Sequence, residues 1–389
     1  MRAISADGER LVHAARDLAP DIFATRDAIE SERRLPEPLV EKMRAAGFFE
    51  LWLPEVFGGP ALHPVEFLAV IEELSAADGS AGWCAMIGAS FSLLAGSLNE
   101  TAAREIFANR AIVAGQVAAA GKAVIVDGGY RVAGRWGYGS GIAHSQWVAG
   151  GCVVHDGAGP RRLPGGGPET RFVFIPTSDV EVIDTWRVGG LRGTGSNDYA
   201  IENVFVPADR TMPAFEAQGV QPGTLYRMPI ASLFPWALAA VTLGIARAAI
   251  DAFVELAAIK TPMTSQTVLR DKPVAQSAVG RADAMLRAAR AGFIDAIETQ
   301  WLEIAAGRTP SLAGRAGVRS ATAFAGEACV RAIELVYNAA GGSAILASGR
   351  LDRCFRDVRV AVQHIGLSTN SYEPVGRVLL GLEPGLPRF

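Results

Sequence analysis

A single histidine stands where a predicted helix near the C-terminus must end. The pattern predicts a helix from Leu351 to about Val362, and Gly366 with the run Ser368-Thr369-Asn370 favours a break after it. His364 lies at that break. An imidazole titrates near neutral pH, so His364 can act as a general base, but on this pattern alone a structural histidine at a frayed helix end is the more common case.

A second candidate is a glycine-rich stretch in the first half of the chain. Gly139 and Gly141 flank Ser140, so the backbone can approach a flat ring closely and the hydroxyl can bond a ring nitrogen. Tyr138 and Trp147 can stack on such a ring or wall it. A glycine-rich bulge with aromatic packing would have the same local sequence. The stretch therefore predicts a ring-binding turn, with a structural bulge as the alternative.

The elements before this stretch are predicted to be helices. Pro36 to Gly47 has a helical apolar stripe and a terminal glycine, and Val65–Ala77 follows a proline. We expect Ser80 to cap a buried helix over Ala81–Ser97, and Asn99 to cap another that ends near Asn109. Residues 1–111 form the first predicted domain.

Short strands and then long helices make up the rest. From Ile112 to Pro207 the chain is rich in Val, Phe, Tyr and Trp with frequent Gly, and Asp127-Gly128-Gly129 marks a hairpin. Helices are predicted over Leu233–Ile259, Lys272–Ala306 and Ala313–Ala340. The predicted β domain spans residues 112–215 and the predicted helical bundle residues 216–389. The fold class is mainly α with a central β domain.

Composition limits the classes of function. The 389 residues carry a net charge of -3 and are 50% hydrophobic, which argues against a nucleic-acid-binding surface and favours a small-molecule partner. The four cysteines have no metal-type spacing, and we expect no metal. The polar N-terminus lacks the apolar segment of a signal peptide, and charges interrupt Leu233–Ile259, so we expect a cytoplasmic protein without a membrane span.

The order of helices, strands and helices resembles the acyl-CoA dehydrogenase family. Three separated stretches carry the resemblance: Leu53-Pro54-Glu55-Val56-Phe57-Gly58-Gly59, the residues from Gly134 to Trp147, and those from Trp186 to Asp198. It covers nearly the whole chain. The resemblance implies an N-terminal helical domain, a central β-barrel-like domain and a C-terminal four-helix bundle, with a flavin between the β domain and the C-terminal helices.

One position departs from the family's dehydrogenases. Where those with the base in this region have a Glu before the Gly, this chain has Ile365, and a hydrocarbon cannot accept a proton. The other base region of the family is similar to Thr242–Ala246 and holds no carboxylate. Gln363–Ser371 instead resembles the flavin-dependent monooxygenase branch of the family, which includes phenol and sterol-ring hydroxylases. That branch implies a two-component system, in which a separate reductase supplies reduced flavin and this chain uses O₂ to hydroxylate a substrate.

The resemblance also implies roles for individual residues. His364 and Ser140 are the catalytic candidates. The cofactor candidates are Trp136, Tyr138, Gly139, Ser140, Gly141, Trp147, Arg192, Gly193, Thr194, Ser196, Gly341 and Gly342. The substrate candidates are Trp83, Ser90, Phe91, His144, Phe234, Trp236 and His364, a set that suits a planar aromatic or polycyclic molecule but is also typical of a bundle core. Reduced FMN is the expected cofactor and FAD the alternative.

Two other functions and one assembly complete the expectations. A dehydrogenase or oxidase acting on an acyl thioester is the first alternative, and a scaffold of this fold without chemistry is the second. Asn338-Ala339-Ala340-Gly341-Gly342 resembles the family segment that reaches a neighbouring subunit's flavin site. We therefore expect a homotetramer, built as a dimer of dimers.

Overall fold

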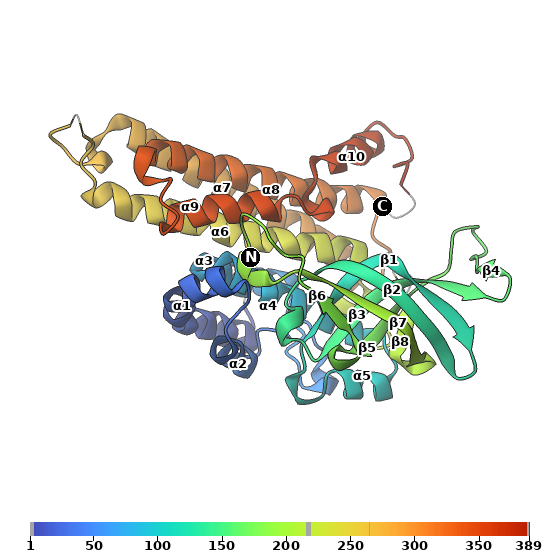
Figure 1. Ribbon diagram of the computed structural model, residues 1–389. Coiled ribbons are helices and arrows are strands. Elements are labelled where there is room, and N and C mark those ends of the chain that lie inside the picture. Colours follow the sequence, from blue (N-terminus) through green and yellow to red (C-terminus); the bar gives the residue numbers. More distant parts are fainter. Residues whose placement is uncertain (1–3, 215–218, 264, 387–388) are drawn as a thin grey trace.

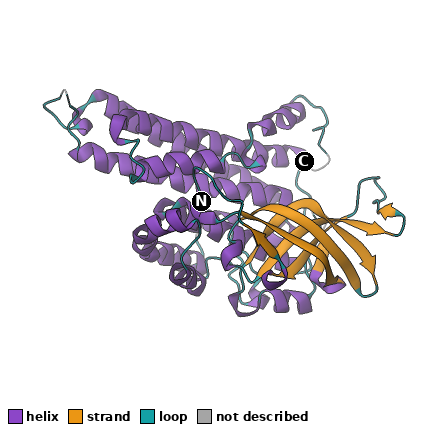
Figure 2. Cartoon of the chain, in the orientation of Figure 1, coloured by secondary structure: helices purple, strands orange, loops and turns teal. Residues whose placement is uncertain are grey.

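The computed structural model describes residues 4–214, 219–263, 265–386 and 389. One group of helices lies beside a sheet, and a second group of long helices runs above both in this view (Figure 1, Figure 2). The first group consists of α1 (Ala6–Glu32), α2 (Glu37–Ala46), α3 (Pro64–Ala77), α4 (Gly79–Ser92) and α5 (Glu100–Ile106). Helix α1 is the long element that the sequence did not predict. Its apolar residues, Leu11, Ala15, Ile22 and Ile29, recur at helical spacing and are buried.

The helix ends follow from particular side chains. Gly47 ends α2 with a φ of 88°, and Asn99 caps α5, both as predicted. The predicted cap of α4 is wrong. Asp78, not Ser80, is the capping residue, because its carboxylate accepts hydrogen bonds from the backbone N–H groups of Ser80 and Ala81 at 2.9 and 3.1 Å. Helix α4 therefore begins two residues early.

The strands form one curved sheet. They are β1 (Val113–Val126), β2 (Gly129–Gly139), β3 (Trp147–Asp156), β4 (Gly159–Pro160), β5 (Thr170–Pro176), β6 (Glu181–Ile183), β7 (Asn197–Pro207) and β8 (Thr211–Pro213). Their order is β6-β7-β2-β1-β3-β5-β8, with β4 on β3, and all pairs except β1 with β3 are antiparallel. The predicted hairpin joins β1 to β2, with Val126 opposite Gly129.

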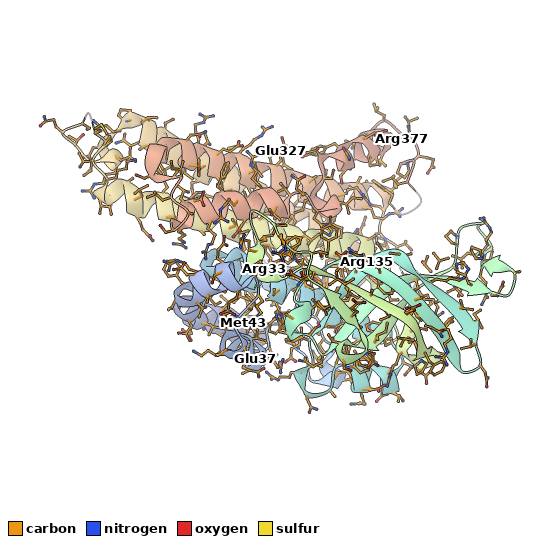
Figure 3. The ribbon with its side chains drawn as sticks, viewed as in Figure 1. Arg33, Glu37, Met43, Arg135, Glu327 and Arg377 are labelled. Carbon is orange, nitrogen blue, oxygen red and sulfur yellow. The ribbon has the colours of Figure 1, made fainter. Side chains whose placement is uncertain are left out.

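The inner face of the sheet has its own core. Trp136 and Tyr199 stack there at 5.3 Å, and their polar atoms bond the backbone oxygens of Gly151 and Ala149 at 2.8 and 2.7 Å. Each bond joins β3 to a strand that is not its neighbour in the sheet, and the two bonds hold the sheet in its curved, barrel-like form. Its edge strands are β6 and β8, so the order does not close. At one edge Arg33, which follows α1, reaches Asp184 beyond β6 at 2.6 Å (Figure 3).

The C-terminal helices lie side by side along the molecule (Figure 1). They are α6 (Ile230–Ile259), α7 (Pro273–Ala305), α8 (Leu312–Ala340), α9 (Arg350–Ala361) and the short α10 (Tyr372–Leu379), which the sequence did not predict. Helix α6 is the central element, since it packs on α3, α4, α8 and α9. Two segments, Gly79–Gly96 and Ile230–Ile259, are long and apolar enough to span a membrane, but 94% and 78% of their apolar windows are buried inside the protein.

Candidate active site

Ser140 lies at the end of β2, where the backbone turns sharply. Tyr138 has a φ of 62° and Gly141 a φ of 77°, so the first and last of four successive turn positions are left-handed. The N–H of Ser140 donates to the carbonyl of Tyr138 at 2.8 Å, and that of Gly141 donates to the carbonyl of Thr194 at 2.8 Å. A glycine suits position 141 because a side chain there would be strained by the backbone and would meet His144 at 2.9 Å. The turn thereby fixes the Ser140 hydroxyl.

That hydroxyl belongs to a buried cluster of polar side chains. The indole N–H of Trp83 donates to Ser140 Oγ at 3.1 Å, and Ser140 Oγ lies 2.7 Å from Ser196 Oγ. Ser196 Oγ lies 2.7 Å from Thr194 Oγ1, whose hydroxyl donates to the carbonyl of Leu191 at 2.9 Å. The structure thus brings together four residues that the sequence analysis had assigned to cofactor or substrate.

The imidazole of His364 also lies near the Trp83 indole. The two ring centroids are 6.3 Å apart at an angle of 60°. As predicted, His364 follows α9 at a break, and it caps a 3-10 turn over Ile365–Leu367. Ser140, Trp83 and His364 therefore form one site, although their positions in the sequence span more than 280 residues.

The hydrogen bonding of His364 restricts its chemistry. Its Nδ1 accepts the backbone N–H of Gly366 at 3.0 Å, so the neutral ring carries its proton on Nε2. Surrounding protein desolvates the ring and lowers the pKa of His364 below its ordinary 6.5, although the residue is exposed on its outer side. At neutral pH the free edge of His364 is therefore a donor. The predicted general-base role would require release of the Nδ1 bond.

Helix α4 extends the site with an apolar face. Trp83, Ser90 and Phe91 recur at helical spacing, and the ring of Phe91 packs edge-on against Phe234 of α6 at 5.8 Å. Phe234 is half-buried. Ser90 directs its hydroxyl to Met86 Sδ at 3.7 Å within the helix, so it does not offer that proton to the site.

His144 is buried beside the Ser140 turn. It is 8% exposed, and its ring lies 5.7 Å from that of Phe49. Neither ring nitrogen has a hydrogen-bond partner among the described residues. Desolvation, with a smaller contribution from the charge of Arg44, lowers the pKa of His144 to about 4, so the ring is neutral. A neutral imidazole with both nitrogens unused is a polar group that a substrate can bind.

Three tryptophans predicted to lie at the site do not. Trp136 fills the core of the sheet against Tyr199. Trp236 is buried in the helical bundle, stacked on Phe293 at 4.5 Å. Trp147 lies beneath the guanidinium group of Arg210 at 5.1 Å, on β3. Trp136 and Trp147 were assigned to the flavin and Trp236 to a planar substrate, but each ring here packs against other side chains of the protein.

Four other cofactor candidates are also occupied elsewhere. Arg192 donates to the backbone oxygen of Glu30 at 3.1 Å and so binds α1. Gly193 packs against Ile29, which a Cβ would approach to 2.0 Å. Gly341 and Gly342 end α8 beside Lys260, at the far end of α6, about 35 Å along that helix from the residues near Gly366. Within one subunit these two glycines do not reach Ser140.

Asp357 supports the site from α9, and the sequence analysis missed it. Its Oδ1 accepts the backbone N–H of Leu191 at 2.6 Å, and Leu191 has a φ of 48°. Burial, followed by the charge of Asp78, raises the pKa of Asp357 to about 7. The C-terminal helices thereby hold the loop from which Thr194 and Ser196 project. The Arg-Asp pair at 356–357 was a visible signal, but its partner could not be read from the sequence.

The chain matches known proteins over most of its length. Residues 5–106 match the family described as acyl-CoA dehydrogenase, N-terminal domain, and residues 236–369 match acyl-CoA dehydrogenase, C-terminal domain. Indole-3-acetate monooxygenase of Pseudomonas putida is 32% identical over 365 residues, which cover 92% of this chain and 90% of that protein. The flavin-dependent monooxygenase oxygenase subunit HsaA of Mycobacterium tuberculosis is 29% identical over 97% of both chains. The structure of XiaF from Streptomyces with FADH₂ and glycerol matches with a TM-score of 0.90, at 26% identity over 98% of both chains.

The chain belongs to the acyl-CoA dehydrogenase family. Its relatives over nearly the full length are named as monooxygenases, and its site lacks the carboxylate of the dehydrogenases at position 365. Within the family it is a flavin-dependent monooxygenase, and so an oxidoreductase.

Proposed function

We propose that this chain is the oxygenase component of a two-component system and hydroxylates a small aromatic or polycyclic molecule. The observation that carries the proposal is the position of Trp83, which bonds Ser140 and also lies near His364. The relative HsaA is named an oxygenase subunit, a name that fits a separate reductase as partner.

The residues at Ser140 suit a flavin ring. Gly139 and Gly141 add no side chains beside the hydroxyl, and Ser140 Oγ keeps one lone pair without a partner among the described residues. Tyr138 is 67% exposed and contacts Trp186 edge-on at 6.2 Å, so an aromatic surface adjoins the turn. The hydrogen-bonding groups here are an indole and three hydroxyls, all uncharged, which suits the uncharged edge of such a ring.

The chemistry that a bound reduced flavin supplies is the two-electron reduction of O₂, with one oxygen atom inserted into the substrate and the other released as water. Ser140 would bond the edge of the ring, and the Trp83 indole would form one side of its pocket. The Nε2–H of His364 donates to an oxygen of the substrate and orients it. The apolar surfaces of α4 and α6, including Phe91 and Phe234, exclude water from the reacting centre.

Cofactor, assembly and location are part of the proposal. Reduced FMN is the expected cofactor, and the structure of XiaF with FADH₂ makes FAD the alternative. Exposed apolar residues support a homotetramer. Ile345 and Leu346, which follow Gly342, are exposed, and Ile365 beside His364 is 83% exposed. The four cysteines are free and buried, which suits a cytoplasmic protein.

The dehydrogenase alternative finds little support in the structure. The second base region of the family, residues 242–246, is buried in α6, and Gly244 packs against the backbone of Glu72 on α3. Glu72 itself binds Arg290 through both carboxylate oxygens. Neither position 365 nor residues 242–246 therefore supply a carboxylate that could take a proton from an acyl thioester.

A single-turnover experiment tests the function. Anaerobically reduced FMN or FAD is bound to the protein and mixed with ¹⁸O₂ and a panel of phenols, indoles and fused-ring aromatics. The expected result is a product that gains one ¹⁸O atom. Reduction of the oxidised flavin by an acyl thioester, with no labelled product from any aromatic substrate, would instead establish the dehydrogenase. Light scattering tests the assembly, where a mass of only 40.9 kDa at micromolar concentration would exclude the tetramer.

A further inference from the structure

The buried hydroxyls at the site form a continuous line of four hydrogen bonds. The line runs from Trp83 Nε1 through Ser140 Oγ, Ser196 Oγ and Thr194 Oγ1 to the carbonyl oxygen of Leu191, with steps of 3.1, 2.7, 2.7 and 2.9 Å. All four side chains are at most 7% exposed. Because these side chains are buried, their donors find their acceptors within the line.

The two ends of the line determine the direction of every bond in it. An indole N–H can only donate, and a carbonyl oxygen can only accept. Each hydroxyl has one proton. The arrangement that satisfies all four bonds therefore has Thr194 donating to Leu191, Ser196 donating to Thr194, and Ser140 donating to Ser196.

The acceptor end is held in place by further contacts. The N–H of Leu191 donates to Asp357 Oδ1 at 2.6 Å, and the indole N–H of Trp186 donates to the Leu191 carbonyl at 3.0 Å. Helix α9 and the loop at Trp186 thus fix the carbonyl to which Thr194 donates. The direction of the line is set by groups outside the hydroxyl cluster.

This direction decides what Ser140 can offer to a ligand. Its proton points inward to Ser196, and one of its lone pairs accepts from Trp83. The lone pair that remains makes Ser140 an acceptor toward the ring. Reduced flavin carries an N–H on its central ring, whereas oxidised flavin has a bare nitrogen there that accepts.

We propose that this line of hydrogen bonds makes the site select reduced flavin over oxidised flavin, with Ser196 and Thr194 as positioning residues. The inference rests on the proposed function, since it requires a flavin at Ser140. Reduced flavin donates to the free lone pair of Ser140 with the line intact. Oxidised flavin can leave the line unchanged, in which case its nitrogen lone pair faces that of Ser140. Alternatively it accepts the Ser140 proton, but then Ser196 donates to Ser140, Thr194 donates to Ser196, and the bond from Thr194 to the Leu191 carbonyl is lost. The loss of one neutral hydrogen bond corresponds to about fivefold in affinity.

The test compares the dissociation constants of oxidised and anaerobically reduced FMN. In Ser196→Ala the proton of Ser140 loses its inward acceptor and can face the ligand. In Thr194→Val, Ser196 loses its acceptor and can donate to Ser140 instead. We expect both variants to bind oxidised FMN more tightly, so that the ratio of the oxidised to the reduced dissociation constant falls about fivefold. The midpoint potential of bound FMN should fall by about 20 mV, the same factor for a two-electron couple.

A matched control separates this effect from general disturbance. Ser92 is a buried hydroxyl of α4 that donates to Ala89 at 2.7 Å, outside the line. Ser92→Ala should keep the wild-type ratio. Unfolding temperatures of the three variants are measured alongside, and because the readout is a ratio within one protein, equal weakening of both forms does not move it.

The outcomes test the preference for reduced flavin separately from the proposed function. A smaller ratio in both line variants, with Ser92→Ala unchanged, supports the inference. Wild-type ratios in folded Ser196→Ala and Thr194→Val overturn it and leave the proposed function standing. A wild-type protein that binds neither form of FMN or FAD overturns the proposed function and the inference with it.

Discussion

The indole nitrogen of Trp83 donates a hydrogen bond to the hydroxyl oxygen of Ser140 across 3.1 Å. The bond is buried and joins α4 to the turn after β2, through two residues that lie 57 positions apart in the sequence. It places the N-terminal helices and the sheet in one site. Without Ser140 the buried indole N–H would lose this acceptor, whereas without Trp83 the Ser140 hydroxyl would still bond Ser196.

The first prediction is that Trp83 and Ser140 are energetically coupled. Trp83→Phe keeps a ring but removes the donor, and Ser140→Ala removes the acceptor. Urea unfolding of the wild type, the two single variants and the double variant gives the coupling free energy. We expect about 1 kcal/mol, the net value of a buried neutral hydrogen bond. Additive effects of the two substitutions would show that the contact contributes nothing to stability.

The second prediction concerns the donor role of His364. Because Nδ1 accepts from Gly366, the group presented to the substrate is Nε2–H. His364→Ala should lower the single-turnover rate of oxygen transfer by about 100- to 1000-fold, the scale for a lost transition-state donor. His364→Gln, whose amide N–H can take the place of Nε2–H, should recover most of that rate.

The general-base role predicted from the sequence gives a different result. A base would make Gln as damaging as Ala, because an amide does not take up a proton. The wild-type rate would then rise with pH through the pKa of His364, which the surrounding protein holds below 6.5, and level off above it. Reduced-flavin binding serves as the control, since the proposed contact of His364 is with the substrate.

The third prediction follows from Asp357, whose buried carboxyl has a pKa raised from 3.8 to about 7. Between these values the folded protein holds a proton that the unfolded chain has released. The free energy of unfolding should therefore fall as pH rises toward 7, by up to about 1.4 kcal/mol per pH unit from this group. Asp357→Asn should remove that slope while its amide oxygen still accepts from Leu191. Urea unfolding at pH 5 and pH 8 measures it, and an unchanged slope in the variant would assign the dependence to other groups.

Much of the fold followed from local patterns in the sequence. Gly47 and Asn99 mark helix ends through their own backbone and side-chain chemistry, so both were predicted correctly. The predicted bounds of α7 and α8 differ from the observed bounds by no more than one residue at any end. Helix α1 was missed because its polar residues outnumber its apolar ones. Its apolar stripe is buried by packing against α3, which the sequence does not show.

The site was predictable only where local sequence and the family resemblance pointed to the same residue. Ser140 was singled out by its flanking glycines and His364 by the predicted helix break, and the structure places both beside Trp83. Trp136 and Trp236 were misassigned, because the sequence does not tell whether an aromatic side chain faces a cofactor or its own core. The direction of the hydroxyl line was beyond sequence reasoning altogether, since it depends on which carbonyl Thr194 reaches.

The last prediction concerns His144, a buried imidazole with neither nitrogen bonded among the described residues. Such a group destabilises the folded state, because desolvation of its polar atoms is not compensated. His144→Leu, of similar volume, should therefore raise the free energy of unfolding by about 1 to 2 kcal/mol. If His144 is kept for binding a polar group of the substrate, the more stable variant should bind the aromatic substrate at least tenfold more weakly, with reduced-flavin affinity unchanged. Urea unfolding and substrate titration measure the two effects. A variant that is more stable and binds substrate as the wild type does would leave His144 with no role at the site, and a less stable variant would show that its nitrogens are satisfied by bound water.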